Sequence, residues 1–224
     1  MVDSTRTRFV WEHRYFPAWY VPLSDVAGEL VPNGRTVESD DRGVGTRYDV
    51  IVGDRTIADA AWRHLDAPVD ELRGLVRFEW HALDAWFEEN TEVFVHPRSP
   101  EVRVDALPSS RHVRVSVDGE VVADSVRPTI LYETGLPPRY YLPKVDVRMD
   151  LLTPTETTSA CPYKGWASYW SVTVGDTTHD DIVWGYRTPL PESEAIAGLV
   201  CFYNEKVDLE IDGEIVDRPR TKFS

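Results

Sequence analysis

Apolar and polar residues alternate over many short segments of this chain, and these segments usually end at a turn signal. Residues 48–52 and 169–174 are rich in β-branched and aromatic side chains, and Gly-Asp closes each of them. Residues 207–213 alternate apolar with acidic side chains. That alternation is typical of a strand with one face in solvent, and a metal site is the alternative interpretation. Short strands are therefore expected along most of the chain.

Long helices are not expected, because 16 prolines and 13 glycines are spread along the sequence. Short helical turns are predicted at residues 24–30, 82–88, 144–151 and 191–197. Residues 93–107 contain two prolines and read as an extended connection.

The chain contains two diverged copies of one small domain. With an offset of 121, residues 2–30 match residues 123–151 at 10 of 29 positions. The offset then grows to 122 and to 124, through insertions in stretches rich in Pro, Thr and Asp, where loops tolerate a change in length. The matches stay collinear, which indicates a tandem duplication. Matched pairs include Glu12 and Glu133, Pro17 and Pro138, Tyr20 and Tyr141, Trp62 and Trp184, and the Gly-Leu-Val-x-Phe segments that start at Gly74 and Gly198.

The two copies differ at their starts. Residues 112–123 alternate, break at Asp118-Gly119 and resume, which is the signature of a β-hairpin. The first copy has no equivalent, so it lacks its opening strand and is expected to lean on the linker or on the second copy. The sequence thus predicts a mainly β protein of two similar small domains. A degenerate first copy spans residues 1–95, a linker 96–111, and a complete second copy 112–224.

Composition narrows the partners. The chain has 24 Lys and Arg against 38 Asp and Glu, a net charge of −14, so no nucleic-acid or membrane partner is expected. No segment is as apolar as a membrane span or a signal peptide, and a cytoplasmic location is expected. Cys161 and Cys201 have neither disulfide context nor zinc-ligand spacing, so no metal and no cofactor is expected. The sequence does not indicate an oligomeric state.

One turn combines several reactive groups. Cys161-Pro162-Tyr163-Lys164-Gly165 places a thiol, a phenol and an amine within four residues. A lysine this close to a cysteine can lower the pKa of the thiol and make it nucleophilic. The alternative is a tight structural turn, set by the proline and the glycine, with a small packed cysteine.

The first copy provides an internal comparison for this turn. It has Ser-Asp-Asp-Arg-Gly at residues 39–43, which keeps the glycine and a positive charge but has no thiol, proline or phenol. Chemistry that depends on Cys161 or Tyr163 is therefore expected in the second copy alone. Arg139 is also specific to that copy, since an alanine stands opposite it. Arg139 and Lys164 are predicted to form a small anion-binding pair, with a solvated arginine as the alternative.

Both copies retain a glutamate and a tryptophan near this region. Glu133, like Glu12, ends an apolar strand before a proline-rich turn, where it would accept hydrogen bonds from loop N–H groups or face a pocket. Trp184 is expected in the core, with a pocket wall as the other interpretation. Tyr140 and Tyr141 are expected in the same wall.

These motifs resemble the bacterial family called domain of unknown function 427, sometimes labelled nucleotidyltransferase-like. They are Asp124-Ser125-x-Arg127, Glu133-Thr134-Gly135-Leu136-Pro137, Arg139-Tyr140-Tyr141-Leu142-Pro143, Cys161-Pro162-Tyr163-Lys164-Gly165 and the segment from Ile196 to Asn204. They cover the second copy nearly completely, and the first copy matches as a degenerate member. The resemblance implies a compact fold of β-tent-like antiparallel sheets. Relatives in that fold class hold zinc with paired cysteines, and this chain has no such pair. It also has no Gly-Ser followed by a spaced Asp pair, so neither zinc nor nucleotidyl transfer is carried over.

Three functions remain open. In the first, the protein is a small-molecule binding module with its pocket in the second copy. In the second, it is an enzyme that uses Cys161 as an activated thiol beside Lys164. In the third, it is a structural or protein-interaction domain without a site. The pocket would be walled by Tyr140, Tyr141, Tyr163 and Trp184 and would take polar contacts from Glu133, Arg139, Cys161 and Lys164.

Overall fold

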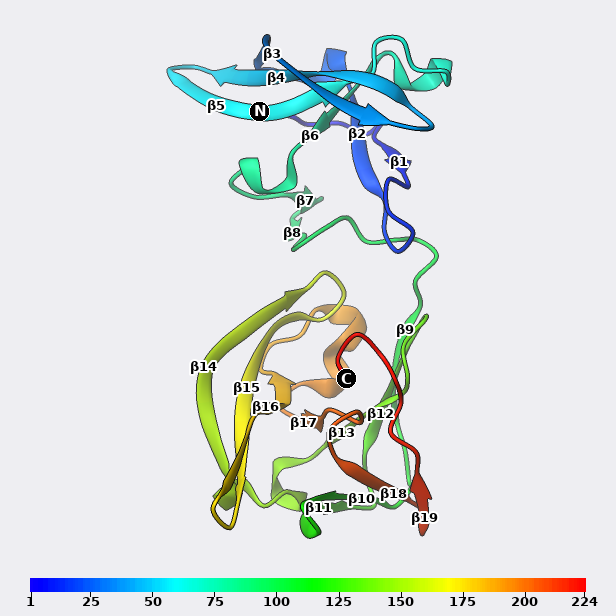
Figure 1. Cartoon of the computed structure of the whole chain (residues 1–224), viewed down its shortest axis with the longest axis vertical. Coiled ribbons are helices and arrows are strands. Elements are labelled where there is room, and N and C mark those ends of the chain that lie inside the picture. Colours follow the sequence, from blue (N-terminus) through cyan, green and yellow to red (C-terminus); the bar gives the residue numbers. More distant parts are fainter. The chain divides into compact units, whose positions relative to one another are not determined.

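The computed structural model describes residues 1–224, and the chain divides into two compact units, Met1–Ser99 and Pro100–Ser224 (Figure 1). Both units consist of antiparallel strands joined by turns and short 3-10 helices. The mainly β, tandem arrangement predicted from the sequence is therefore confirmed. None of the helices is long and apolar enough to cross a membrane.

The first unit is built on one six-stranded sheet with the order β1-β2-β6-β5-β4-β3. Its three longest strands are neighbours and curve together in Figure 1. The strands are β1 (Arg8–Val10), β2 (Ala18–Pro22), β3 (Glu29–Ser39), β4 (Gly43–Val52), β5 (Arg55–Arg63) and β6 (Leu75–Phe78).

The second unit has two sheets. The larger one has the order β14-β15-β16-β17-β13-β12-β9, and the smaller one has the order β11-β10-β18-β19. The larger sheet contains β9 (Val104–Pro108), β12 (Thr129–Glu133), β13 (Arg139–Leu142), β14 (Leu152–Cys161), β15 (Gly165–Val174), β16 (Thr177–Tyr186) and β17 (Val200–Phe202). The smaller sheet contains β10 (Val113–Val117), β11 (Glu120–Ser125), β18 (Asp208–Ile211) and β19 (Glu214–Val216).

The same bulge marks both copies. β4 and β5 shift register next to Asp59, and β15 and β16 shift register next to Asp181. Asp59 has a φ of 54° and Asp181 a φ of 51°, a left-handed conformation that aspartate tolerates better than most residues. Asp49 accepts a 2.8 Å hydrogen bond from the Asp59 amide, and Ser171 accepts one of 3.2 Å from the Asp181 amide. The duplication thus extends to backbone detail.

The hairpin of residues 112–123 forms as predicted, as β10 and β11, and Val113, Val115, Val117 and Val122 enter the core between the two sheets of the second unit. The first unit has no counterpart of this hairpin. The corresponding face of its sheet, around Val21 and Val76, packs instead against Ala82, Leu83 and Trp86 of the same unit. This face is therefore covered from within the first unit.

Three predicted elements differ from the structure. Residues 82–88 are not one helical turn, because Trp80–Ala82 forms a 3-10 helix and β7 (Phe87–Glu88) pairs with β8 (Thr91–Glu92). In residues 24–30 the turn is confined to Leu23–Asp25. The predicted linker, 96–111, contains β9, whose pairing with β12 is a long-range contact that its local prolines do not reveal. The turns at 144–151 and 191–197 are present as Lys144–Asp146, Met149–Leu151 and Pro191–Ile196.

Candidate functional site

The turn between β14 and β15 fixes the position of Lys164. Cys161 and Gly165 are paired in register, and the Lys164 amide donates a 3.3 Å hydrogen bond to the Cys161 carbonyl. Gly165 has a φ of 89°, which a residue with a Cβ adopts only under strain. From outside the turn, the Leu190 amide donates to the Lys164 carbonyl at 3.2 Å. The backbone is thus held from two sides, and the Lys164 side chain is buried.

Lys164 forms an ion pair with Glu133, the last residue of β12. The distance from Nζ to Oε2 is 2.5 Å, and the two side chains are only 10% and 13% exposed. Burial lowers the pKa of the Lys164 ammonium, but the adjacent Cys161 sulfur and the Glu133 carboxylate outweigh it and raise the pKa above its ordinary value. The structure therefore brings Cys161, Lys164 and Glu133 together, and this arrangement favours the charged form of Lys164.

Two buried phenols lie next to this group. Burial raises the pKa of Tyr186, and the nearby Cys161 and Glu133 raise it further. Burial likewise raises the pKa of Tyr141, whose hydroxyl accepts a 3.1 Å hydrogen bond from the Trp184 indole N–H. Tyr186 was not predicted as a site residue. Its signal was available, because it lies two positions after Trp184 on one strand and alternate residues share a face.

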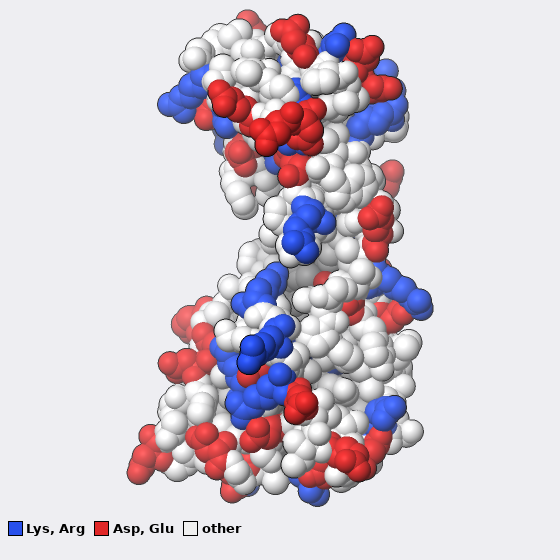
Figure 2. All heavy atoms as spheres, turned by 45° about the vertical axis from the view of Figure 1, so that its right-hand side comes forward, with Lys and Arg blue, Asp and Glu red and all other residues white.

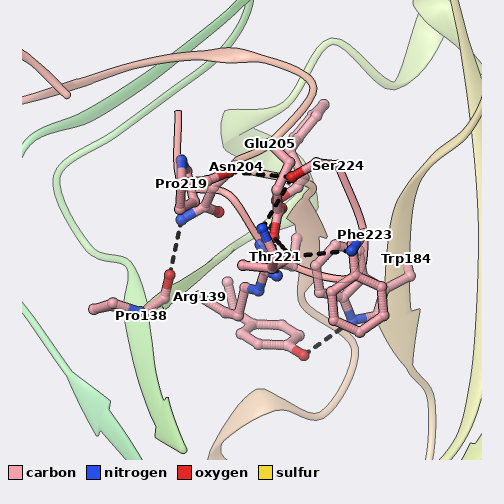
Figure 3. A network of polar contacts seen from close by, with 12 residues as sticks. Pro138, Arg139, Trp184, Asn204, Glu205, Pro219, Thr221, Phe223 and Ser224 are labelled. Carbon is pink, nitrogen blue, oxygen red and sulfur yellow. Dashed lines mark hydrogen bonds and ion pairs between the residues drawn. The ribbon is translucent and has the colours of Figure 1, made fainter. Parts of the chain in front are cut away.

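Arg139 forms a separate ion pair, with Glu205 (Figure 3). Both hydrogen bonds are 2.7 Å long, and Glu205 also accepts one of 2.5 Å from Thr221. Burial raises the pKa of Glu205, but the hydrogen bonds from Arg139 and Thr221 lower it below its ordinary range overall. The predicted anion-binding pair of Arg139 and Lys164 is not formed, because each cation is neutralised by its own carboxylate.

Aromatic rings enclose the Arg139 guanidinium. Its central carbon lies 5.6 Å from the Trp184 ring centroid, 5.8 Å from that of Tyr203 and 5.6 Å from that of Phe223. Asn204 donates a 2.8 Å hydrogen bond to the Pro138 carbonyl and ties the same loop to β13 (Figure 3). Arg139 is therefore part of the internal framework of the second unit.

The two remaining predicted residues are Tyr140, which lies apart from this group, and Tyr163, which contributes its backbone carbonyl. Tyr140 follows Arg139 on a strand, so its side chain takes the opposite face and packs against the core between the two sheets. The prediction that Tyr140 and Tyr141 share one wall is corrected, because neighbouring strand residues point to opposite faces. The Tyr163 carbonyl accepts a 3.2 Å hydrogen bond from the Ser193 hydroxyl.

The first unit has its own version of the glutamate site. Glu12 accepts a 2.6 Å hydrogen bond from the Tyr20 hydroxyl and one of 3.3 Å from Arg77 Nε. Arg77 stands where the second copy has Cys201, and its guanidinium lies 4.6 Å from the Trp62 ring centroid. Arg77 thus takes the place over the shared tryptophan that Arg139 occupies in the second unit. The glutamate therefore has polar partners in both copies, but the partners differ.

The charged side chains on the surface do not form a site of one sign alone. Acidic side chains are spread over the visible face of each unit, and Lys and Arg side chains gather on part of it (Figure 2). Several arginines of the second unit are paired with carboxylates, such as Arg111 with Asp212 and Arg218 with Asp208. No group of three or more His, Cys, Asp or Glu side chains is arranged to hold a metal ion.

The family model described as Domain of unknown function (DUF427) matches residues 1–89 and 105–213. The chain belongs to this family. Its two matched segments correspond to the two repeats, which confirms the resemblance found in the sequence. The second DUF427 match begins inside β9, in agreement with the pairing of that strand in the larger sheet. No curated protein matches the chain.

Proposed function

We propose that this protein is a small-molecule binding module and that its second unit binds a small polar ligand beside Cys161. The observation that carries the proposal is the buried Lys164–Glu133 ion pair next to the thiol. A buried ion pair is weak evidence for stability, since its desolvation penalty can exceed the Coulombic gain. Polar groups retained at such a cost are typical of functional sites.

The hydrogen-bonding capacity of the group defines the ligand class. Oε2 of Glu133 accepts the bond from Lys164, so Oε1 is available to a ligand donor. The ammonium has three N–H donors, of which one bonds Glu133 and a second interacts with the Cys161 sulfur, so one is left for a ligand acceptor. The site therefore suits a small molecule that carries both a donor and an acceptor.

Thermal shift on a metabolite library tests the proposal, with wild type compared with the Cys161→Ala/Lys164→Ala double variant. Compounds that stabilise the wild type should lose their effect in the double variant. Ser39→Ala changes the equivalent turn of the first unit and is the matched control, which should keep the effect. The proposal fails if no compound stabilises the wild type or if both variants respond alike.

A reactive thiol is the second candidate, because the Lys164 ammonium lies beside the Cys161 sulfur. The electrostatics favour binding instead. Glu133 is already paired with Lys164, so the ammonium is not available to Cys161 alone. Alkylation by iodoacetamide at neutral pH, read by peptide mass, separates the two candidates. Cys161 reacting many times faster than free cysteine would establish the thiol chemistry. Cys201 is the internal control, since it is fully buried and burial raises its pKa to about 12.

A further inference from the structure

A cavity of about 80 Å³, partly open to solvent, lies in the first unit. It lies where β2 and β6 approach the segments that carry Trp80 and Trp86. Ala18 lines it, whereas the second copy has Arg139 at the matching position. The Arg77 guanidinium lies over Trp62 as that of Arg139 lies over Trp184, so the cavity lies beside this guanidinium, where the small Ala18 side chain leaves room.

The walls of the cavity are aromatic and held in place. Trp80 and Trp86 stack with ring centroids 4.7 Å apart and planes 9° apart, and the Trp86 indole donates a 2.9 Å hydrogen bond to the Trp80 carbonyl. Trp19 lies 5.6 Å from each of them at a tilt. Phe16 stacks on His96 at 4.0 Å. Preorganised rings of this kind favour an aromatic ligand, because little side-chain freedom is lost on binding.

The polar part of the cavity is the Glu12–Arg77 ion pair. Arg77 Nη2 lies 3.2 Å from Glu12 Oε2, and Tyr20 donates to the other carboxylate oxygen. The two charges cancel. A cationic ligand would be repelled by Arg77, and an anionic ligand would be repelled by Glu12. A neutral group that carries a donor and an acceptor side by side, such as an amide, matches both.

The volume limits the size of the ligand. An engineered apolar cavity of about 150 Å³ binds benzene, and this cavity is about half as large but partly open. It therefore holds the amide and one edge of a single ring, with the rest of the ring extending toward solvent, and it has no room for a fused ring system.

We infer that the first unit contains a second binding site, which takes a single neutral aromatic ring bearing an amide group. The ring lies against Trp19 and Trp86, and the amide meets Glu12 and Arg77. This site is independent of the proposed ligand site beside Cys161, because every side chain that forms it belongs to the first unit.

A series of ligands with one shape and three charges tests the inference. Benzamide, benzoate and benzylamine are titrated into the full-length protein, and binding is followed through the indole N–H resonances in the NMR spectrum. Benzamide should shift the resonances of Trp19, Trp80 and Trp86, and each charged analogue should bind at least about tenfold more weakly. No shift with benzamide, or equal affinity for all three compounds, would overturn the inference.

Two variants separate cavity binding from general changes in the fold. Trp86→Leu removes a wall, and Trp166→Leu, a tryptophan of the second unit, is its matched control. Ala18→Leu fills the cavity without removing any wall, so it covers the case in which Trp86→Leu does not fold. Binding should be lost in Trp86→Leu and Ala18→Leu and kept in Trp166→Leu. Unchanged binding in Ala18→Leu, with a native amide spectrum, would contradict the site.

Discussion

Arg139 and Glu205 form a two-bonded ion pair with both hydrogen bonds at 2.7 Å, and their side chains are only 6% and 0% exposed. Neither residue has a charge-matched counterpart in the first copy, where Ala18 and His81 stand at these positions. The ion pair is therefore specific to the second copy.

Glu205→Gln should destabilise the second unit by about 3–5 kcal/mol, because it leaves a buried guanidinium without its carboxylate. The double variant Arg139→Met/Glu205→Met should cost less than the sum of the single variants, since no buried charge remains. Urea unfolding followed by tryptophan fluorescence measures both. Additive losses would show that the two residues act independently.

Tyr141→Phe should destabilise the second unit by about 1–3 kcal/mol. The Trp184 indole N–H donates to the Tyr141 hydroxyl at 3.1 Å, and both side chains are buried. Without the hydroxyl the indole donor has no partner. The free energy of unfolding of the variant measures the effect, and a neutral result would mean that the donor finds another acceptor.

The stability of the first unit should fall as the pH drops below about 6.5, the ordinary pKa of histidine. Burial, and then the nearby Arg42, lower the pKa of His64 in the folded state. The unfolded chain therefore binds a proton at a higher pH than the folded one. The stability is fully present above the unfolded pKa and is lost as the pH falls toward the folded pKa.

Urea midpoints at a series of pH values between 5 and 8 test the role of His64. His64→Phe should flatten the pH dependence, because the ring no longer titrates. His81→Phe, at an exposed position, is the control and should leave the dependence in place. Equal slopes in wild type and His64→Phe would assign the effect to other groups.

Gly185→Ala should destabilise the second unit by about 1–3 kcal/mol or more through overpacking. A Cβ at this position would lie 2.5 Å from the Leu199 carbonyl oxygen, and backbone cannot move aside as a side chain can. Gly74→Ala is the matched control, since a Cβ there meets nothing within 4 Å and the backbone isn't left-handed. Thermal unfolding of both variants gives the comparison, and equal midpoints would contradict it.

The candidate site was partly predictable from local sequence. Cys161 and Lys164 lie in one turn, and Glu133 was marked because both copies keep it; the structure brings the three residues together. The partner of Arg139 was not predicted, because Glu205 is 66 positions away and belongs to a different loop. A comparison of the copies could have indicated the pair, because Arg139 and Glu205 both differ from the residues at the matching positions of the first copy.

The first unit shows a different limit. Its cavity depends on Ala18 and Trp19 of β2 and on Trp86, which is far from them in sequence and meets them only when β2 lies beside the segment after β6. The pattern of apolar and polar residues along the chain does not predict such a long-range contact. The first copy lacks the Cys-Pro-Tyr signature, and its Glu12–Arg77 ion pair lies beside an aromatic wall.

By itself the sequence determined the duplication, the strand-rich fold and the β10–β11 hairpin, because period-two patterning, turn residues and repeat matches act over short distances along the chain. Only the tertiary structure decided which charges meet. Lys164 and Arg139 each pair with a carboxylate brought in by another segment, since a buried charge must be neutralised by whatever partner the fold places within hydrogen-bonding distance.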